Sequence, residues 1–144
     1  MASGLYDIAE GVSVPAGDAA EVWALLDRFM ANSRVPYKEH LDAHLETLLF
    51  PHVRIASQQV NVFPDAASYG AAFLKTDDVM QSGFDHSEWT SRRIVQADPS
   101  KVHVAVTFER YTKDNSPIAT ERSLYVIEKI DGRWGIRGRS SFAQ

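Results

Sequence analysis

Hydrophobic residues recur every three or four positions in the first half of the chain, and every second position in its last third. The first half therefore predicts helices, and the last third predicts β-strands. The first helix is predicted over residues 19–31, because Asp18 is a potential N-cap, Glu21 stands three positions later, and apolar residues follow at helical spacing. Residues 1–17 lack a clear period and are interpreted as an arm that precedes a single domain of residues 18–144.

Two further helices are predicted before the strands. One begins near Pro36, a favourable first-turn residue, and ends before Pro51. The other follows Asp65, a potential N-cap, and ends before Asp77. Between these helices, residues 52–63 alternate loosely and are rich in Val and Ile, which predicts one bent strand or a short strand pair.

Four long strands are predicted from the alternating pattern that follows, at residues 86–97, 101–112, 118–130 and 133–142. Turn residues separate them, and Asp131-Gly132 is typical of a two-residue type I′ hairpin. The register of that hairpin places Ile127 opposite Ile136, Tyr125 opposite Gly138, and Ser123 opposite Ser140. A four-residue loop at 113–116 likewise places Val102, Val104 and Val106 opposite Ile127, Tyr125 and Ser123.

The two turns agree on which side chains share the inner face of the predicted sheet. This face comprises Val102, Val104, Val106, Phe108, Tyr125, Ile127, Trp134 and Ile136. The opposite face mixes Ala105, Leu124 and Val126 with charged residues, among which alternation places Arg137 and Arg139. Because such a half-polar surface suits subunit contact, we expect a homodimer that forms through the outer face of the sheet.

The tail of the chain is similar to SnoaL-like members of the nuclear transport factor 2-like (NTF2-like) superfamily. The likeness rests on these runs: Phe108-Glu109-Arg110-Tyr111, Asp114-Asn115, Ser123-Leu124-Tyr125-Val126-Ile127, Asp131-Gly132-Arg133-Trp134 and Arg139-Ser140-Ser141-Phe142. The element order also resembles that superfamily. The resemblance implies an α+β fold, in which a cone-like, curved antiparallel sheet of four long strands plus short strands packs on three helices around an apolar pocket. Members include ketosteroid isomerases, polyketide cyclases, dehydratases, lyases and proteins that only bind or dock, so fold alone does not select an activity.

Composition narrows the class of partner. The net charge is −4, from 15 basic and 19 acidic residues, and the basic residues are scattered, which argues against nucleic acid. The absence of cysteine excludes thiolate chemistry and disulfides. No window approaches the length of a membrane span, no secretory signal pattern opens the chain, and no glycine-rich phosphate loop is present. We therefore expect a soluble, cytoplasmic protein that uses neither a nucleotide cofactor nor a membrane.

One stripe of the predicted second helix carries candidate chemistry. Tyr37, His40 and His44 fall on the same side as Leu41 and Leu48, away from the charged residues. A histidine among apolar side chains can exchange protons near neutral pH, and a phenol can orient a substrate oxygen or stabilise an oxyanion. We therefore hypothesise that His44, His40 and Tyr37 are catalytic. The alternative is that the histidines lie at the margin of the core, hydrogen-bonded to backbone or water.

The His40-x-x-x-His44 spacing would also let both imidazoles reach one metal ion. No Glu lies between them in the manner of the His-Glu-x-x-His motif, so we assign no metal and no cofactor.

Six residues from other elements are predicted to bind the substrate: Trp23, Phe84, Trp89, Arg110, Tyr125 and Ser140. The alternatives are core packing for the aromatic residues, an ion pair with Glu121 for Arg110, and a hydrogen bond with Ser123 for Ser140.

Two functional classes follow from these patterns taken together with what the resemblance implies. The first is a cofactor-independent lyase, isomerase or dehydratase that applies His and Tyr acid–base chemistry to a hydrophobic, ring-containing metabolite. The second is a non-catalytic, homodimeric ligand-binding or scaffold protein. They differ in whether Tyr37, His40 and His44 converge on an enclosed cavity.

Overall fold

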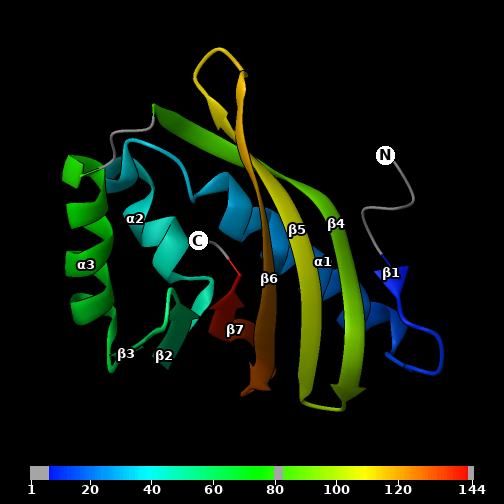
Figure 1. The fold of residues 1–144 in the computed structure, drawn as a ribbon. Helices are drawn as coiled ribbons and strands as arrows, with labels where there is room; N and C mark the ends of the chain where they lie inside the picture. Colours follow the sequence, from blue (N-terminus) through cyan, green and yellow to red (C-terminus); the bar gives the residue numbers. More distant parts are fainter. Residues whose placement is uncertain (1–6, 80–82, 143–144) are drawn as a thin grey trace.

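The computed structural model describes residues 7–79 and 83–142 (Figure 1). Within these ranges the chain forms three helices, α1 (Ala16–Ala31), α2 (Tyr37–Leu45) and α3 (Ala66–Val79). The same ranges contain seven strands: β1 (Asp7–Ile8), β2 (Leu48–Ala56), β3 (Gln59–Phe63), β4 (Phe84–Asp98), β5 (Lys101–Thr112), β6 (Pro117–Ile130) and β7 (Arg133–Ser141). None of the helices in the described ranges is both long and apolar enough to cross a membrane.

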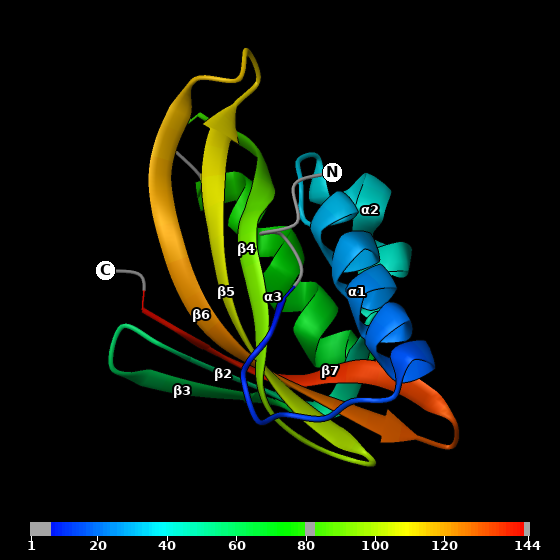
Figure 2. The same ribbon diagram turned by 90° about the vertical axis from the view of Figure 1, so that its right-hand side faces the viewer.

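The strands form one curved sheet in the order β1-β4-β5-β6-β7-β2-β3, which confirms the predicted α+β class. The four long strands pair antiparallel, as predicted, but β1 joins β4 and β2 joins β7 in parallel, so the whole sheet is mixed. Strands β4, β5 and β6 arch over the helices, which occupy the concave side, while β2, β3 and β7 run beneath (Figure 2).

The helices differ from the prediction at their ends. Helix α1 begins at Ala16, so Asp18 lies in its first turn and is not the N-cap. The Asp18 carboxylate instead accepts hydrogen bonds from Lys129 Nζ, at 3.1 Å, and from Trp134 Nε1, at 3.2 Å. Helix α2 ends at Leu45, and Leu48, predicted to be helical, is the first residue of β2. The predicted cap of α3 is confirmed, since Asp65 Oδ1 accepts a 2.8 Å bond from the Ser68 amide.

The predicted arm of residues 1–17 is partly held by the sheet. Residues 1–6 lie outside the described residues, but Asp7 and Ile8 pair with β4. Ile8, Val12 and Val14 pack against the hydrophobic core. The ordered fold therefore begins before the predicted boundary at Asp18.

Two tight hairpins set the strand register. Asp131 and Gly132 both have positive φ, at 52° and 78°, as the predicted type I′ turn requires. Ser57 and Gln58 adopt the same left-handed region between β2 and β3, which resolves the ambiguous stretch into a strand pair. The predicted pairings of β5 with β6 are confirmed.

The register of β6 with β7 follows the prediction only as far as the pair Ile127–Ile136. Beyond it, β7 contains one extra residue, so Val126 pairs with Gly138 and Tyr125 pairs with Arg139. Such a β-bulge exchanges the two faces of the strand that follows it. The predicted pairs of Tyr125 with Gly138 and of Ser123 with Ser140 are therefore wrong by one position. Arg139 lies on the inner face of the sheet, although alternation placed it outside.

The inner face packs on α1 to form the core. Val22, Leu25 and Leu26 of α1 are buried against β-strand residues that include Val104 and Ile127. Trp134 closes one end of this core and is 5% exposed. Burial of these side chains is the main favourable term in the stability of the domain.

We expect Trp134→Ala to lower the free energy of unfolding by about 3 to 5 kcal/mol, because it leaves a large cavity under α1. Urea denaturation followed by circular dichroism measures the change. Arg133→Ala, at the exposed neighbouring position, should change stability by about 0.5 kcal/mol or less. A Trp134→Ala protein as stable as this control would contradict the assigned inner face.

Candidate functional site

A cavity of about 520 Å³ lies between the inner face of the sheet and the helices. All three helices and every strand from β2 to β7 contribute to its wall. Its volume falls within the range typical of small-molecule sites. The lining residues are Phe29, Met30, Ser33, Tyr37, His44, Arg54, Asn61, Phe63, Tyr69, Ala72, Phe73, Thr76, Phe84, Ser87, Phe108, Arg110, Glu121, Ser123, Tyr125, Arg139 and Ser141.

Aromatic rings make up much of the wall on the helix side. The ring of Phe73 stacks on Tyr37, with centroids 4.3 Å apart, and on His44, with centroids 4.2 Å apart. Tyr69 contacts Phe63 edge to face at 5.0 Å. Such rings present flat, weakly polar surfaces that suit a ring-containing ligand.

A directed chain of hydrogen bonds runs behind this aromatic wall. Ser33 Oγ donates to the Phe29 carbonyl at 2.6 Å and can therefore accept from His44 Nδ1, which lies 3.2 Å away. The carbonyl of Asn32 also favours a proton on this imidazole. With Nδ1 protonated, His44 Nε2 accepts from the Tyr69 hydroxyl at 2.9 Å.

The guanidinium of Arg139 links Tyr69, at one end of this chain of hydrogen bonds, to a second histidine, His52. Its Nη2 lies 3.0 Å from Tyr69 Oη, and its Nε lies 3.3 Å from His52 Nε2. His52 Nδ1 in turn donates to the Ile136 carbonyl at 3.0 Å. These hydrogen bonds set the tautomers of both imidazoles.

Both histidines of the network are neutral. Burial, followed by the positive charge of Arg139, lowers the pKa of His44 to about 3 and the pKa of His52 to about 3. Neither imidazole therefore carries a positive charge at neutral pH. They orient Arg139 and Tyr69 but do not offset the charge of the guanidinium.

Three arginines and one carboxylate bring formal charge to the cavity. Arg54 of β2 is the register partner of Arg139 on β7. Arg110 lies farther along β5, with its guanidinium 4.7 Å from the ring centroid of Phe84. Glu121 on β6 is the acidic residue of the described wall. The described wall of the cavity therefore carries more positive than negative formal charge.

Five of the nine residues predicted to form the site line this cavity. They are Tyr37, His44, Phe84, Arg110 and Tyr125. The structure thus brings together side chains from α2, β4, β5 and β6, as the sequence suggested. Their predicted roles in binding or catalysis stay predictions.

Four predicted site residues lie outside the cavity wall: His40, Trp23, Trp89 and Ser140. His40 is half-buried at the edge of α2. Trp89 donates from Nε1 to the Leu26 carbonyl at 3.1 Å, and Trp23 has the Arg92 guanidinium 5.6 Å from its ring centroid, so both serve the contact between α1 and β4. The bulge turns Ser140 outward, and Ser141 takes its place, with its Oγ 3.1 Å from Ser123 Oγ.

The sequence interpretation missed Tyr69, Arg54 and Arg139 as site residues. Tyr69 lies on the buried side of α3, where the sequence pattern indicates core packing and its hydroxyl gives no signal of its own. Arg54 could have been found, because it alternates with outward Val53 and Ile55 in the short strand pair. Arg139 could not be found from alternation, since the bulge reverses its direction. Among the described residues no group of three or more His, Asp or Glu is placed to hold a metal ion.

Comparison with known structures supports the fold. A protein of unknown function with a cystatin-like fold from Nostoc punctiforme superposes with a TM-score of 0.75 at 15% identity, covering 90% of this chain and 93% of that one. A proposed aromatic ring hydroxylase from Novosphingobium aromaticivorans gives 0.69 at 12% identity, with 90% of each chain covered. A proposed ketosteroid isomerase from Shewanella frigidimarina gives 0.64 at 14% identity, covering 94% and 98%.

These identities are too low to transfer an activity, and they establish the fold alone. No functionally curated protein matches the chain by sequence. The model of an NTF2-like protein family, DUF6841, matches residues 16–141, which is nearly the whole described chain. The resemblance of the tail to NTF2-like proteins is therefore confirmed, and the chain belongs to this NTF2-like family.

Proposed function

We propose that the protein binds a small, hydrophobic, ring-containing molecule in the cavity. The observation that carries this proposal is a cavity of about 520 Å³ whose wall includes eight Phe and Tyr side chains. Stacked rings on α2 and α3 provide flat contacts, while hydroxyl and guanidinium groups at the sheet provide polar contacts. This combination suits a ligand with an apolar body and a polar end.

A second candidate is a cofactor-independent lyase, isomerase or dehydratase that acts on such a ligand. The observation that favours it is that the Glu121 carboxylate and the Arg110 guanidinium belong to the same cavity wall. A carboxylate can accept a proton from carbon, and a guanidinium can stabilise the oxygen on which charge develops.

His44 is one of the residues that the sequence predicts to be catalytic, and its geometry suggests a different role. Its ring nitrogens bond to Tyr69 and Ser33, and its pKa of about 3 makes the imidazole a weak base. In the proposed enzyme, Glu121 is therefore the better base. His44 acts behind Tyr69, whose hydroxyl it orients.

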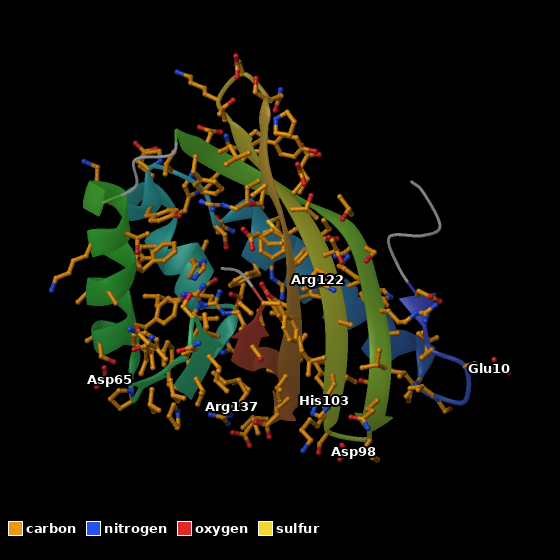
Figure 3. The ribbon with its side chains drawn as sticks, in the orientation of Figure 1. Glu10, Asp65, Asp98, His103, Arg122 and Arg137 are labelled. Atoms are coloured by element: carbon orange, nitrogen blue, oxygen red, sulfur yellow. The ribbon has the colours of Figure 1, made fainter. Side chains whose placement is uncertain are left out.

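We further propose that the protein forms a homodimer through the outer face of the sheet. One register row across five strands of that face comprises Val60, Ile55, Ser140, Leu124 and Ala105. Val60 is 66% exposed and Ile55 is 45% exposed, so much of this mostly apolar row is open to solvent in the single chain. Figure 3 shows the molecule from this side, with His103 on β5 and Arg122 on β6 labelled.

Ligand binding is tested by obstructing the cavity from α3. Ala72 lines the cavity and Ala71, its neighbour on the helix, does not; both are exposed. The neutral fluorescent probe N-phenylnaphthylamine should bind the wild type and Ala71→Trp alike, whereas Ala72→Trp should weaken binding by about tenfold or more. Fluorescence titration measures the affinity. No binding to the wild type, or equal loss in both variants, would reject the proposal.

Catalysis is tested by hydrogen–deuterium exchange of the ring ketone tetralone in heavy water, followed by NMR. If Glu121 removes a proton next to the carbonyl, Glu121→Gln should slow exchange by about 10²- to 10⁴-fold. Glu46→Gln, at an exposed position on α2's C-cap, should have no effect. Loss of exchange in folded His44→Gln, with Glu121→Gln active, would identify His44 as the base. If the wild type shows no exchange above background, the catalytic proposal is rejected and the binding proposal is unaffected.

The homodimer is tested by placing a charge in the outer row. Leu124→Glu should shift the molar mass measured by light scattering from about twice 16.1 kDa to that of one chain. Ala71→Glu adds the same charge on α3, away from the sheet, and should leave the dimer intact. A monomeric wild type at micromolar concentration would overturn this expectation.

A further inference from the structure

The polar end of the cavity is built from one register row of the sheet. Across β3, β2, β7 and β6 the inner-face partners are Asn61, Arg54, Arg139 and Tyr125. All four line the cavity. Neighbouring strands are about 4.8 Å apart, so side chains of this row lie close enough to contact one small group together.

Two positive charges in this row are adjacent and lack an acidic partner. Among the described residues, no carboxylate oxygen lies within 4.0 Å of the guanidinium nitrogens of Arg54 or Arg139. The side chains that hydrogen-bond to Arg139 are His52, Tyr69 and Tyr125, and they orient it without supplying a negative charge. Like charges held side by side at a partly buried site repel each other unless an anion lies between them.

Arg54 also has an unused hydrogen-bond donor. Its Nε is buried and has no hydrogen-bond partner in the structure. Burial, and then the charge of Arg139, lower the pKa of Arg54, because both disfavour its charged form. An unpaired buried donor on a charged group is rare and costly, so such a donor marks a place where an acceptor is missing.

The other charged groups of the cavity lie elsewhere along the sheet. Arg110 is six residues from Val104, the β5 member of the row, which corresponds to about 20 Å along the strand. Glu121 faces Phe108, four residues from that row on β6. The row therefore forms a cationic end of the cavity. The charge of Glu121 acts on Arg54, but no ion pair within 4.0 Å joins the two side chains.

From this arrangement we infer that the ligand carries a carboxylate, which accepts hydrogen bonds from Arg54 and Asn61 beside the charge of Arg139, while its ring contacts the aromatic wall. This inference rests on the proposed binding function and specifies the class of ligand. Planar guanidinium groups match the two oxygens of a carboxylate, and an anion there supplies both the missing acceptor and the missing negative charge.

The test compares two competitors that share one ring system and differ in charge. Naphthoate and its methyl ester are each titrated against bound N-phenylnaphthylamine. We expect naphthoate to displace the probe from the wild type at a concentration at least about tenfold lower than the ester does, because its carboxylate forms charge-assisted hydrogen bonds. Added salt should reduce the preference.

Two variants test whether Arg54 recognises the carboxylate. In Arg54→Gln the preference for naphthoate over the ester should disappear, and a circular dichroism spectrum and melting temperature like those of the wild type show that the variant is folded. Arg122→Gln removes an exposed arginine from the outer face and should keep the full preference (Figure 3).

The outcomes separate this inference from the proposed function. If the wild type binds the probe but prefers neither competitor, the inferred carboxylate is wrong while the binding function stands, and this result needs no variant. A preference that persists in Arg54→Gln would also overturn the assignment to this row. If the wild type fails to bind the probe at all, the proposed binding function itself fails.

Discussion

The guanidinium of Arg139 is a positive charge on the inner face of the sheet, and the surrounding structure is arranged to hold it. Its nitrogens donate to Tyr69 and His52, and its centre lies 5.2 Å from the ring centroid of Phe29. Through these contacts one side chain of β7 joins α1, α3 and β2. Because an inward-facing charge requires hydrogen-bond acceptors, the orientations of Tyr69 and His52 depend on Arg139, and His44 depends on it through Tyr69.

Contacts that hold α1 against the strands, outside the cavity wall, keep the cavity open. Arg92 donates to Asp27 at 2.7 Å and Trp89 donates to the Leu26 carbonyl, which fix the helix against β4. At the opposite end, Asp18 accepts from Lys129 and Trp134. With α1 tied at both places, the space under α2 and α3 is not closed by movement of the helix onto the sheet. Trp89 and Trp134 thus stabilise the position of α1 without lining the cavity.

The sequence predicted the architecture well because its signals are local. Type I′ turn residues and strict alternation set the register of β5 with β6, and the same pattern placed Tyr125 and Arg110 on the cavity side. The helical stripe of α2 likewise placed Tyr37 and His44. Errors arose where a contact between distant segments decides the outcome. Asp18 is satisfied by Lys129, more than one hundred positions away, and so does not act as the cap that its local pattern indicates.

The site was harder to predict than the fold for a physical reason. The sequence does not distinguish an arginine that faces the cavity from one that faces solvent. Only the pairing of β7 with both β6 and β2 shows that Arg139 faces the cavity. Gly138 contributes to this pairing, because a Cβ at that position would lie 3.2 Å from the Val53 carbonyl oxygen, closer than most contacts allow. The close approach of β2 to β7 at this glycine accompanies the change of register that turns Arg139 inward.

The bulge in β7 makes the chemistry of the cavity depend on the register of a strand as well as on the identity of its residues. If the same residues paired with β6 without the bulge, simple alternation would carry Arg139 to the outer surface and bring Ser140 inside. The positive charge of Arg139 would then be lost from the cavity, although the sequence would be unchanged. Deleting Arg137, the residue without a partner on β6, would instead leave Arg139 opposite Tyr125 on the inner face. Arginines that occupy the same position in two aligned sequences therefore face opposite sides of the sheet if only one of the two strands contains the bulge.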